Sequence, residues 1–480
     1  MSMETVFYKA KYLIVWDEGQ HKVLYDGYLG VKGDTVEGVY RTLPEGASCE
    51  DLGEAVLFPG FVNLHTHPSE LFSIKSFVED NANPNFYESS LIDKPIPHMG
   101  RRGAELQTLI NLAELIKSGV TSALIYGGPY SRLEADTAGK LGMRAWVGAG
   151  IRAGDAMEDT WIWHSPDGHS VEYTFDEEAG KERLKEAEVL FKDYDGAYDG
   201  RIHIMMGPTQ TMTCTPWMLE ETRRLADKLG CGITIHACED MTEYESAVRL
   251  RGKTPVRLMA DTGILGEDCV IAHCVYINGH SRAWMQYDDD LELLARSKST
   301  VAHSPTPFAR VGERLESYTK YKNAGINLAF GTDTFPSDFI QEMRLAAFMG
   351  KMTEHTSTAL NAGDIFNTAT IGGAKGLGRK DLGRLEKGAK ADFVVVGLDN
   401  IEMTPARDVV KTLVYTATRH SVQDVYVAGK KIVSKGMVEG FDERAACAEL
   451  RQIAHDAYAD VRDVQGHGMD EVYKMTFPKY

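Results

Sequence analysis

The sequence predicts an α/β fold, a (β/α)8 TIM-type barrel with a small β-sandwich domain built from both chain ends. Three observations lead to this prediction. Apolar runs that fit short strands alternate with amphipathic helical stretches along residues 59–384, and such alternation indicates parallel strands joined by helices. These strand-like runs number eight, as a closed barrel of this type requires. Strand-like patterns without helical periodicity fill residues 1–58 and return in residues 385–440.

The predicted barrel elements follow one another in a regular order. The strand runs are VLFPGFVNLH, VTSALIYG, MRAWVGAG, RIHIMMG, CGITIHA, CVIAHC, STVAHS and NLAFGTD. Helical periodicity is clearest in AELQTLINLAELIKSG, EAGKERLKEAEVLFKDY and PWMLEETRRLADKLG. Residues 68–102 lack a regular pattern, and their place after the first strand favours a functional loop over the site. Residues 441–480 are predicted to form a C-terminal helix and a tail.

The composition is that of a globular protein, with 43% hydrophobic and 25% charged residues. The net charge of −18 argues against nucleic acid or an anionic membrane surface as a partner. No stretch approaches the roughly 20 apolar residues of a membrane helix, and the first residues lack the features of a signal peptide. The seven cysteines include no CxxC pair, which favours free thiols and a cytoplasmic location.

Side chains that bind metal ions stand at the ends of four predicted barrel strands. His65 and His67 end the first run, and their spacing of two residues places both imidazoles on one face. His236 and His273 end the fifth and sixth runs, and Asp333 ends the eighth. Because the C-terminal ends of barrel strands meet at one face, we expect these side chains to converge. Taken singly, each has a structural explanation, such as a helix N-cap for Asp333.

Glu239 follows His236 by three residues, so a short turn would bring its carboxylate to the same place. A carboxylate there can move protons between water and a substrate. The alternative is an ordinary acidic loop formed by Glu239 and Asp240. Cys238 lies between His236 and Glu239, and it is the cysteine closest to the predicted site.

Eight blocks of the sequence, in this order, resemble those of the amidohydrolase superfamily, in its branch of heterocycle deaminases and chlorohydrolase-like triazine hydrolases. They are PGFVNLHTH, GPTQTMTCTPWML, IHACE, IAHCVYI, VAHSPTPFARVG, GTDTFPSDFIQEMR, LGRLEKGAKADFVVV and VYVAGKKIVSKG, and they span nearly the whole chain. The resemblance implies a mononuclear centre that holds one divalent ion, zinc with iron or manganese as alternatives. The implied ligands are His65, His67, His236 and Asp333. The segment RIHIMMGPTQ carries no lysine of the kind that bridges two metals in binuclear relatives.

The resemblance further implies Glu239 as a proton shuttle and His273 as a polarising base, with Asp333 and His273 orienting and deprotonating a water. A bound cation lowers the pKa of water from about 15.7 toward about 7, so that hydroxide can attack a ring carbon. The implied activity is hydrolytic deamination of an amino-substituted N-heterocycle, a small-molecule substrate. One alternative is a hydrolase that expels chloride, an alkylamine or a thiol, or that cleaves a urea, carbamate or amide C–N bond. A second alternative is a non-catalytic, ligand-binding relative. Members of the superfamily are often dimers or tetramers, so a homo-oligomer is expected.

The chain departs from the nucleoside-type deaminases of this branch at three places. Thr209 stands where they carry a histidine, Phe308 stands where they carry an asparagine, and the first loop lacks their Arg-Gly pair. These departures favour a flatter, less polar ligand than a nucleoside. The candidate pocket residues, for each of which core packing or a structural hydrogen bond is the alternative, are Gln210, Trp217, Phe308, Phe335 and His98.

Overall fold

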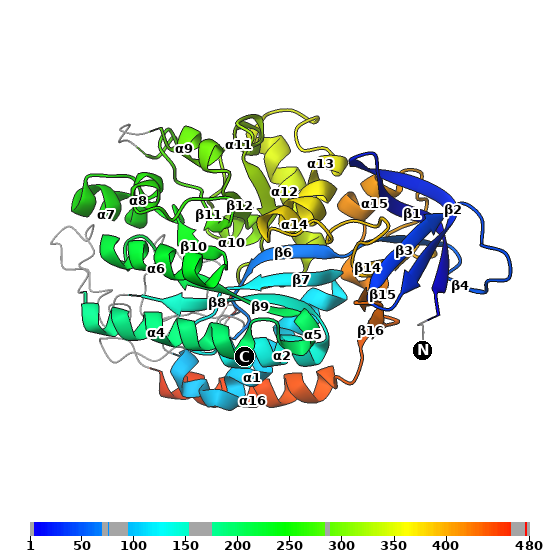
Figure 1. Ribbon diagram of the computed structural model, residues 1–480, viewed down its shortest axis with the longest axis horizontal. Helices are drawn as coiled ribbons and strands as arrows, with labels where there is room; N and C mark the ends of the chain where they lie inside the picture. The colour runs from blue at the N-terminus through cyan, green and yellow to red at the C-terminus, as the bar shows by residue number, and fades with distance from the viewer. Residues whose placement is uncertain are drawn as a thin grey trace.

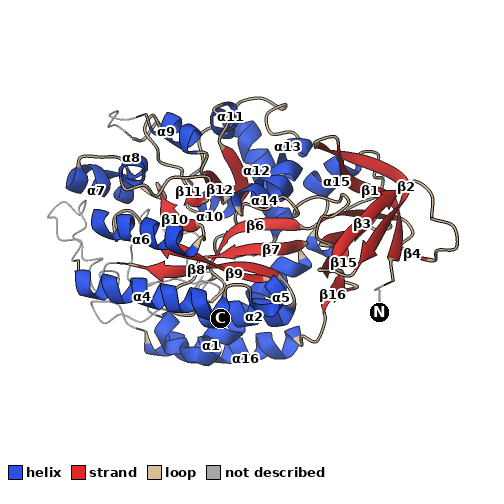
Figure 2. Ribbon diagram, in the orientation of Figure 1, coloured by secondary structure: helices blue, strands red, loops and turns tan. Residues whose placement is uncertain are grey.

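Two sheets organise the chain, an eight-stranded parallel sheet and a nine-stranded mixed sheet. They are seen in a computed structural model that describes residues 4–69, 75, 95–152, 175–283, 289–461 and 476–477. The mixed sheet stands at one end of the parallel sheet, and helices surround the parallel sheet (Figures 1 and 2).

The parallel sheet follows chain order. Its strands are β6 (Phe61–Thr66), β7 (Val120–Ile125), β8 (Arg144–Ile151), β9 (Ile202–Pro208), β10 (Ile233–Ala237), β11 (Cys269–His273), β12 (Thr300–His303) and β13 (Asn327–Phe330). All residues of β6, β7, β10, β11 and β12 are buried, as expected for parallel strands covered on both faces. Each strand lies within one of the eight predicted runs or extends one residue past its C-terminal end, and the predicted barrel fold is confirmed.

Backbone hydrogen bonds between the first and last strand regions close the barrel. The N–H groups of Thr332 and Asp333, just beyond β13, both donate to the His65 carbonyl at 2.9 Å. The His67 N–H donates to the Asp333 carbonyl at 2.8 Å. Closure therefore brings two histidines of the first strand region against an aspartate that lies far along the chain.

Helices follow most of the barrel strands. They are α1 (Pro95–Lys117), α2 (Ser131–Leu141), α4 (Glu177–Tyr194), α5 (Ala197–Gly200), α6 (Pro216–Leu229), α7 (Met241–Arg251), α8 (Pro255–Asp261), α9 (Asp290–Ser297), α10 (Pro305–Arg310), α11 (Tyr318–Asn323), α12 (Phe339–Thr353), α13 (Ala362–Asn367), the π-helical turn η3 (Thr368–Gly372) and α14 (Gly373–Gly376). Side chains of Asp176, Thr215 and Asp338 cap the starts of α4, α6 and α12. The predicted helices correspond to α1, α4 and α6, and two of them extend one or two residues past the observed helix end. Most of the segment 68–102, predicted as a functional loop, lies outside the described residues.

The mixed sheet draws its strands from both chain ends. Its order is β17 (Met437–Val438), β16 (Lys430–Ser434), β15 (Val422–Val427), β14 (Phe393–Gly397), β5 (Ala55–Pro59), β1 (Val6–Asp17), β2 (Gln20–Lys32) and β3 (Thr35–Tyr40), with β4 (Cys49–Asp51) also paired to β1. The predicted run VLFPGFVNLH divides at Gly60, so that β5 joins this sheet while β6 begins the barrel. A Cβ on Gly60 would meet the Thr121 side chain at 2.1 Å, which explains a glycine at the crossing.

A buried ion pair joins the mixed sheet to the barrel. Arg144 at the start of β8 places its Nε 2.6 Å from Oδ2 of Asp392, and both side chains are buried. The other Asp392 oxygen accepts the Ala428 N–H at 2.8 Å. The mixed sheet thus lies on the side of the N-terminal strand ends, and the C-terminal ends point away from it, as β8 does in Figure 1.

The chain continues from the mixed sheet into α16. The remaining elements are α15 (Val409–Tyr415), η4 (Arg419–Ser421) and α16 (Glu443–Asp460). Helix α16 packs along α1 (Figure 1), where Leu106 and Ile110 meet Ala446 and Leu450. In the part of the chain that the structure describes, no helix has the length and apolarity to cross a membrane. All seven cysteines are free thiols.

Candidate metal centre and active site

Three imidazoles and one carboxylate converge at the C-terminal end of the barrel. Nε2 of His67 lies 3.1 Å from Nε2 of His65 and 3.0 Å from Nε2 of His236. Oδ1 of Asp333 lies 3.1 Å from the His65 Nε2 and 3.5 Å from the His67 Nε2. These residues come from β6 and its end, from β10 and from the segment after β13, so the barrel alone brings them together.

These four side chains fit a divalent cation. Two ligand atoms at about 2.1 Å from a tetrahedral ion stand roughly 3.4 Å apart, close to the separations seen here. The His236 Nδ1 lies 2.9 Å from the Thr209 carbonyl. An N–H donated to that carbonyl leaves the lone pair on Nε2, the atom that faces the other ligands.

The ionisation states also suit a cation. Burial lowers the pKa of His67 to about 3 and holds the pKa of His236 well below its usual value, so both imidazoles are neutral at pH 7. Burial alone would raise the pKa of Asp333, but the contact with His65 and the nearby His273 hold it well below its usual range. Neutral imidazoles and a carboxylate are the forms that bind metal ions.

Asn63 fixes the strand that carries two of the histidines. Its Oδ1 accepts the N–H groups of His65 and Thr332, both at 3.2 Å, and its Nδ2 donates to the Thr332 Oγ1 at 2.8 Å. Asn63 therefore ties β6 to the segment that leads to Asp333. The sequence analysis missed this residue, although its spacing of two from His65 places it on the same strand face.

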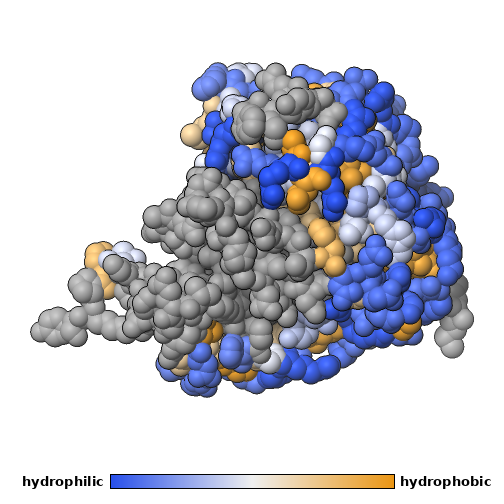
Figure 3. Space-filling model, turned by 90° about the vertical axis from the view of Figure 1, so that its left-hand side faces the viewer, coloured by the Kyte–Doolittle hydropathy of each residue, from blue (hydrophilic) through white to orange (hydrophobic). Residues whose placement is uncertain are grey.

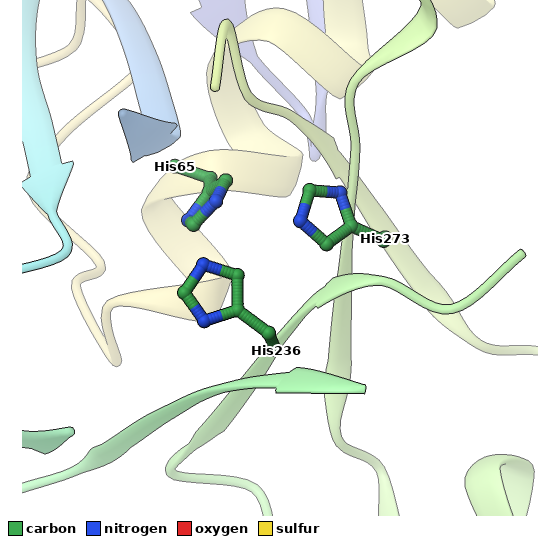
Figure 4. Close-up of side chains that lie close together, drawn as sticks. All are labelled: His65, His236 and His273. Atoms are coloured by element: carbon green, nitrogen blue, oxygen red, sulfur yellow. The ribbon is translucent and has the colours of Figure 1, made fainter. Parts of the chain in front are cut away.

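Glu239 and His273 lie beside the four candidate ligands. Nε2 of His273 is 3.6 Å from Oε1 of Glu239, and the nitrogens of His65, His236 and His273 form a second group whose members lie within 4.8 Å of one another. Figure 4 shows these three imidazoles facing a common point. Both His273 ring nitrogens are buried without a hydrogen-bond partner among the described residues. Such orphaned groups are costly unless a ligand engages them.

The carboxyl group of Glu239 differs from a surface glutamate in its proton affinity. Burial raises its pKa well above the usual value, and the negative charges of Asp333, Asp240 and Glu243 raise it further. Burial also lowers the pKa of His273 to about 3. The pair therefore offers a carboxyl with a raised proton affinity and a neutral imidazole beside it, an arrangement suited to general acid–base chemistry.

A cavity of about 760 Å³ opens onto these groups. The residues around it include His67, His236, Glu239 and Asp333. Tyr126 also lines the cavity, with its ring centroid 4.3 Å from that of His236. Figure 3 looks onto this end of the molecule, where the described surface is mainly hydrophilic with scattered hydrophobic side chains. The cavity gives a small molecule access to the site.

Two of the predicted pocket residues lie at the reacting groups. Gln210 lines the cavity and donates from Nε2 to Oε2 of Glu239 at 3.4 Å. Phe308 is buried and meets His273 edge to face, with ring centroids 5.3 Å apart. Gln210 is thus a polar contact of Glu239, and Phe308 is an apolar wall against His273.

The other predicted pocket residues lie elsewhere. Phe335 is buried beneath Arg310, whose guanidinium carbon is 4.3 Å from the ring centroid. Trp217 is in the first turn of α6, with the Lys181 ammonium 5.8 Å from its ring. His98 is exposed on α1. These three are not among the described residues that line the cavity.

The structure also shows which roles Asp333 and Cys238 do not have. Asp338, not Asp333, caps α12, and its carboxylate accepts the Gln341 N–H at 3.1 Å. The Cys238 side chain is buried in the main hydrophobic core, which leaves its neighbour Glu239 to face the cavity. Asp333 is therefore free to act within the cluster of histidines.

Eight parallel strands with a histidine–aspartate cluster at their C-terminal ends define a barrel of the enzyme type, with a candidate metal centre at the face where such barrels carry their active sites. Comparison with known sequences identifies the family, because the sequence profile of the amidohydrolase family matches residues 56–432. The chain belongs to the amidohydrolase family. The predicted resemblance is confirmed, and the protein is a metal-dependent hydrolase.

Several deaminases are similar to this chain in sequence. A 5-methylthioadenosine/S-adenosylhomocysteine deaminase of Desulfitobacterium hafniense is 29% identical, over 89% of this chain and 94% of the relative. A 5'-deoxyadenosine deaminase of Methanosarcina barkeri is 29% identical, over 95% of this chain and 98% of the relative.

Solved structures share the fold. A zinc-bound adenosine deaminase from Xanthomonas campestris has a TM-score of 0.76 and 23% identity, covering 94% of this chain and 98% of its own. A zinc complex of atrazine chlorohydrolase from Arthrobacter aurescens TC1 has a TM-score of 0.77 and 20% identity, covering 94% of this chain and 100% of its own.

Proposed function

We propose that this amidohydrolase removes an amino group from an N-heterocycle by hydrolysis and that it uses one divalent ion, zinc, to do so. The observation that carries the proposal is the convergence of four ligand atoms beside an acid–base pair. Nε2 of His67 lies 3.0–3.1 Å from the Nε2 atoms of His236 and His65, and Oδ1 of Asp333 lies 3.1–3.5 Å from the Nε2 atoms of His65 and His67. All three nitrogens are the type of ligand that zinc prefers, and catalytic zinc sites combine such nitrogens with a carboxylate.

A cation held by these residues would lower the pKa of a water and so supply a nucleophile at neutral pH. Different residues of the chain would then carry out the individual proton transfers. The Asp333 carboxylate and the His273 imidazole, whose ring nitrogens have no hydrogen-bond partner among the described residues, orient the water and accept its proton. Glu239, whose pKa burial raises well above its usual value, donates a proton to a ring nitrogen and makes the adjacent carbon more electrophilic.

The net reaction balances without a further reagent. Water adds its oxygen to the ring carbon, the C–N bond to the amino group breaks, and ammonia leaves after it receives a proton. Glu239 and His273, with Oε1 and Nε2 3.6 Å apart, can pass that proton between the water and the leaving group. Gln210 holds the other Glu239 oxygen at 3.4 Å during the transfer.

The substrate class rests on two kinds of support. The similar deaminases named above act, by their names, on adenosine-type nucleosides, which supports an aminopurine or a related ring. Thr209 and Phe308 favour a flatter ligand, because Phe308 presents an apolar edge to His273 and Thr209 turns its hydroxyl to the Ile151 carbonyl at 3.3 Å. We therefore propose an amino-substituted heterocycle as the substrate. The assay below distinguishes a free ring from a ring that carries a sugar.

The test is ammonia release by the zinc-loaded protein from adenosine-type nucleosides, free purines, pyrimidines, pterins and triazines. We expect one zinc per chain and stoichiometric ammonia from at least one amino-substituted ring. Consumption of a chloro- or alkylamino-triazine without ammonia would instead favour expulsion of chloride or an alkylamine. Protein that binds no metal and turns over nothing would favour a ligand-binding relative.

We further propose that the enzyme is a cytoplasmic homo-oligomer, a dimer or a tetramer. The seven free thiols support a reducing compartment. Sedimentation equilibrium would test the oligomer, and a mass equal to that of one 53.2 kDa chain would contradict it.

A further inference from the structure

Glu239 lies in a segment that no regular element holds in place. Strand β10 ends at Ala237 and helix α7 begins at Met241, so Glu239 falls in the irregular connection between them. The preceding residue, Cys238, has a left-handed backbone with φ of 56°. An acid–base group must be held to within a fraction of an ångström to work. Some other contact therefore has to fix the position of Glu239.

Glu243 makes that contact from the first turn of α7. Its side chain is wholly buried. Oε2 accepts the backbone N–H of Glu239 at 2.9 Å, and Oε1 faces the Thr211 hydroxyl at 2.6 Å. One carboxyl group thus binds two loops that follow different barrel strands, β9 and β10.

Helix capping does not account for this arrangement. Asp240 is the N-cap of α7 and accepts the Glu243 N–H at 2.7 Å. In a capping box, the glutamate at the third helical position returns a bond to the N–H of the cap residue itself. Glu243 reaches one residue further, to Glu239, and uses its second oxygen on a residue outside the helix. A cap would need neither the burial nor the bond to Thr211.

The two loops that Glu243 joins carry the two partners of a contact at the reaction centre. Thr211 is the chain neighbour of Gln210, and Gln210 donates to the Glu239 carboxylate at 3.4 Å. We propose that Glu243 is the positioning residue for Glu239: by bridging both loops, it sets the distance between Gln210 and Glu239 and so aims the proton-transferring carboxyl. The inference rests on the role proposed above for Glu239.

The chemistry of the bridge suggests a conservative variant. The Thr211 hydroxyl donates to Oε1 of Glu243 in the bridge. Burial raises the pKa of Glu243 to about 8, and a protonated Glu243 keeps both contacts if the Thr211 hydroxyl rotates to accept instead, while Oε2 still accepts from the Glu239 N–H. A glutamine offers the same acceptor and the same donor in the same shape. Glu243→Gln is therefore expected to preserve the bridge, whereas Glu243→Ala removes it.

The experiment compares these variants by steady-state ammonia release and metal content. We expect Glu243→Ala to keep its zinc, to lower kcat by up to about 100-fold, the scale of a 1 Å misplacement, and to change KM far less. Glu243→Gln should retain most of kcat. Asp442→Ala is the matched control, because Asp442 caps the remote helix α16 by accepting the Ala445 N–H at 3.0 Å. It should remove a carboxylate from a helix start without any loss of kcat.

A double-mutant cycle separates positioning from general damage. Because Glu243 acts through Glu239, Glu243→Ala should cost less than about twofold in kcat when added to Glu239→Gln. Unchanged kcat in Glu243→Ala, or a full additional loss in the Glu239→Gln background, would overturn the inference while leaving the function of Glu239 intact. Near-normal kcat in Glu239→Gln alone would overturn both. Should Glu243→Ala fail to fold, Thr211→Val removes half of the bridge, and an unchanged kcat there would equally refute the role.

Discussion

Replacing Glu239 by glutamine tests the acid–base role with little change in shape. The amide oxygen can still accept from Gln210, whose Nε2 is 3.4 Å from the native carboxylate. The amide cannot release or take up a proton, whereas the carboxyl of Glu239, with its raised pKa, can do both. Loss of one such group costs about 10²–10⁴ in rate, which at about 1.36 kcal/mol per tenfold is roughly 2.7–5.4 kcal/mol of transition-state stabilisation.

The metal content separates this loss from damage to the metal centre. The Glu239 oxygens contact Gln210 and His273 and do not belong to the group of His65, His67 and Asp333. We therefore expect Glu239→Gln to bind as much zinc as the native protein and to lose kcat by the factor given above. The assay is ammonia release with zinc measured by mass spectrometry, and Glu220→Gln on the exposed face of α6 is the matched control. A kcat within a few-fold of the native value would refute the reasoning.

Three further predictions concern the metal, the pH dependence of stability and the join between barrel and sheet. Asp333→Ala should lower both zinc content and kcat, because its Oδ1 stands 3.1 Å from the His65 nitrogen; an unchanged zinc content would remove Asp333 from the ligands. Burial raises the pKa of Glu342 from 4.5 to about 8, so the folded state holds a proton that the unfolded chain releases, and stability falls as pH rises through this window. The slope from this one group is about 1.4 kcal/mol per pH unit. Glu342→Gln does not titrate, so its free energy of unfolding, measured with urea, should rise relative to that of the native protein between pH 5 and 8. A difference between the two free energies that does not change with pH would contradict this. Asp392→Ala should lower the free energy of unfolding by about 3–5 kcal/mol, because it leaves Arg144 buried without its partner. The exposed pair of Lys9 and Asp51 is the control, and Asp51→Ala should cost no more than about 1 kcal/mol.

The residues that sequence analysis found are those whose position follows from the strand alone. His65, His236, His273 and Asp333 end strands or lie just beyond them, and the barrel brings all C-terminal strand ends to one face. A local pattern therefore predicts a distant contact, such as the 3.0 Å between His67 and His236. The strand pattern also predicted the barrel, since buried parallel strands read as continuous apolar runs.

The contacts that sequence analysis did not predict are made between loops and between helices, and they depend on the arrangement of these elements in the fold. Glu243 has the sequence signal of a helix cap, and only the fold reveals that its carboxyl binds Thr211 in another loop. The contact between the Thr209 carbonyl and the His236 ring could be made by any residue at that position, so no side-chain pattern predicts it. Trp217 and His98 were chosen for chemical type, but helix orientation places one in the first turn of α6 and the other on an exposed face of α1. The chemical type of a side chain does not predict whether its helix turns that side chain toward the cavity.

The backbone at the barrel mouth explains why this site needs the whole fold around it. Cys238, His273 and Asp333 have φ values of 56°, 77° and 58°, a region that costs a non-glycine residue roughly 1–2 kcal/mol. Glycine would remove the strain at each position, but it would also remove the imidazole of His273 and the carboxylate of Asp333. The strain at Asp333 persists because its N–H and carbonyl are bound by His65 and His67 at 2.9 and 2.8 Å. The hydrogen bonds that close the barrel are therefore the same ones that hold a strained aspartate against the histidines, and closure and metal binding are expected to stabilise each other.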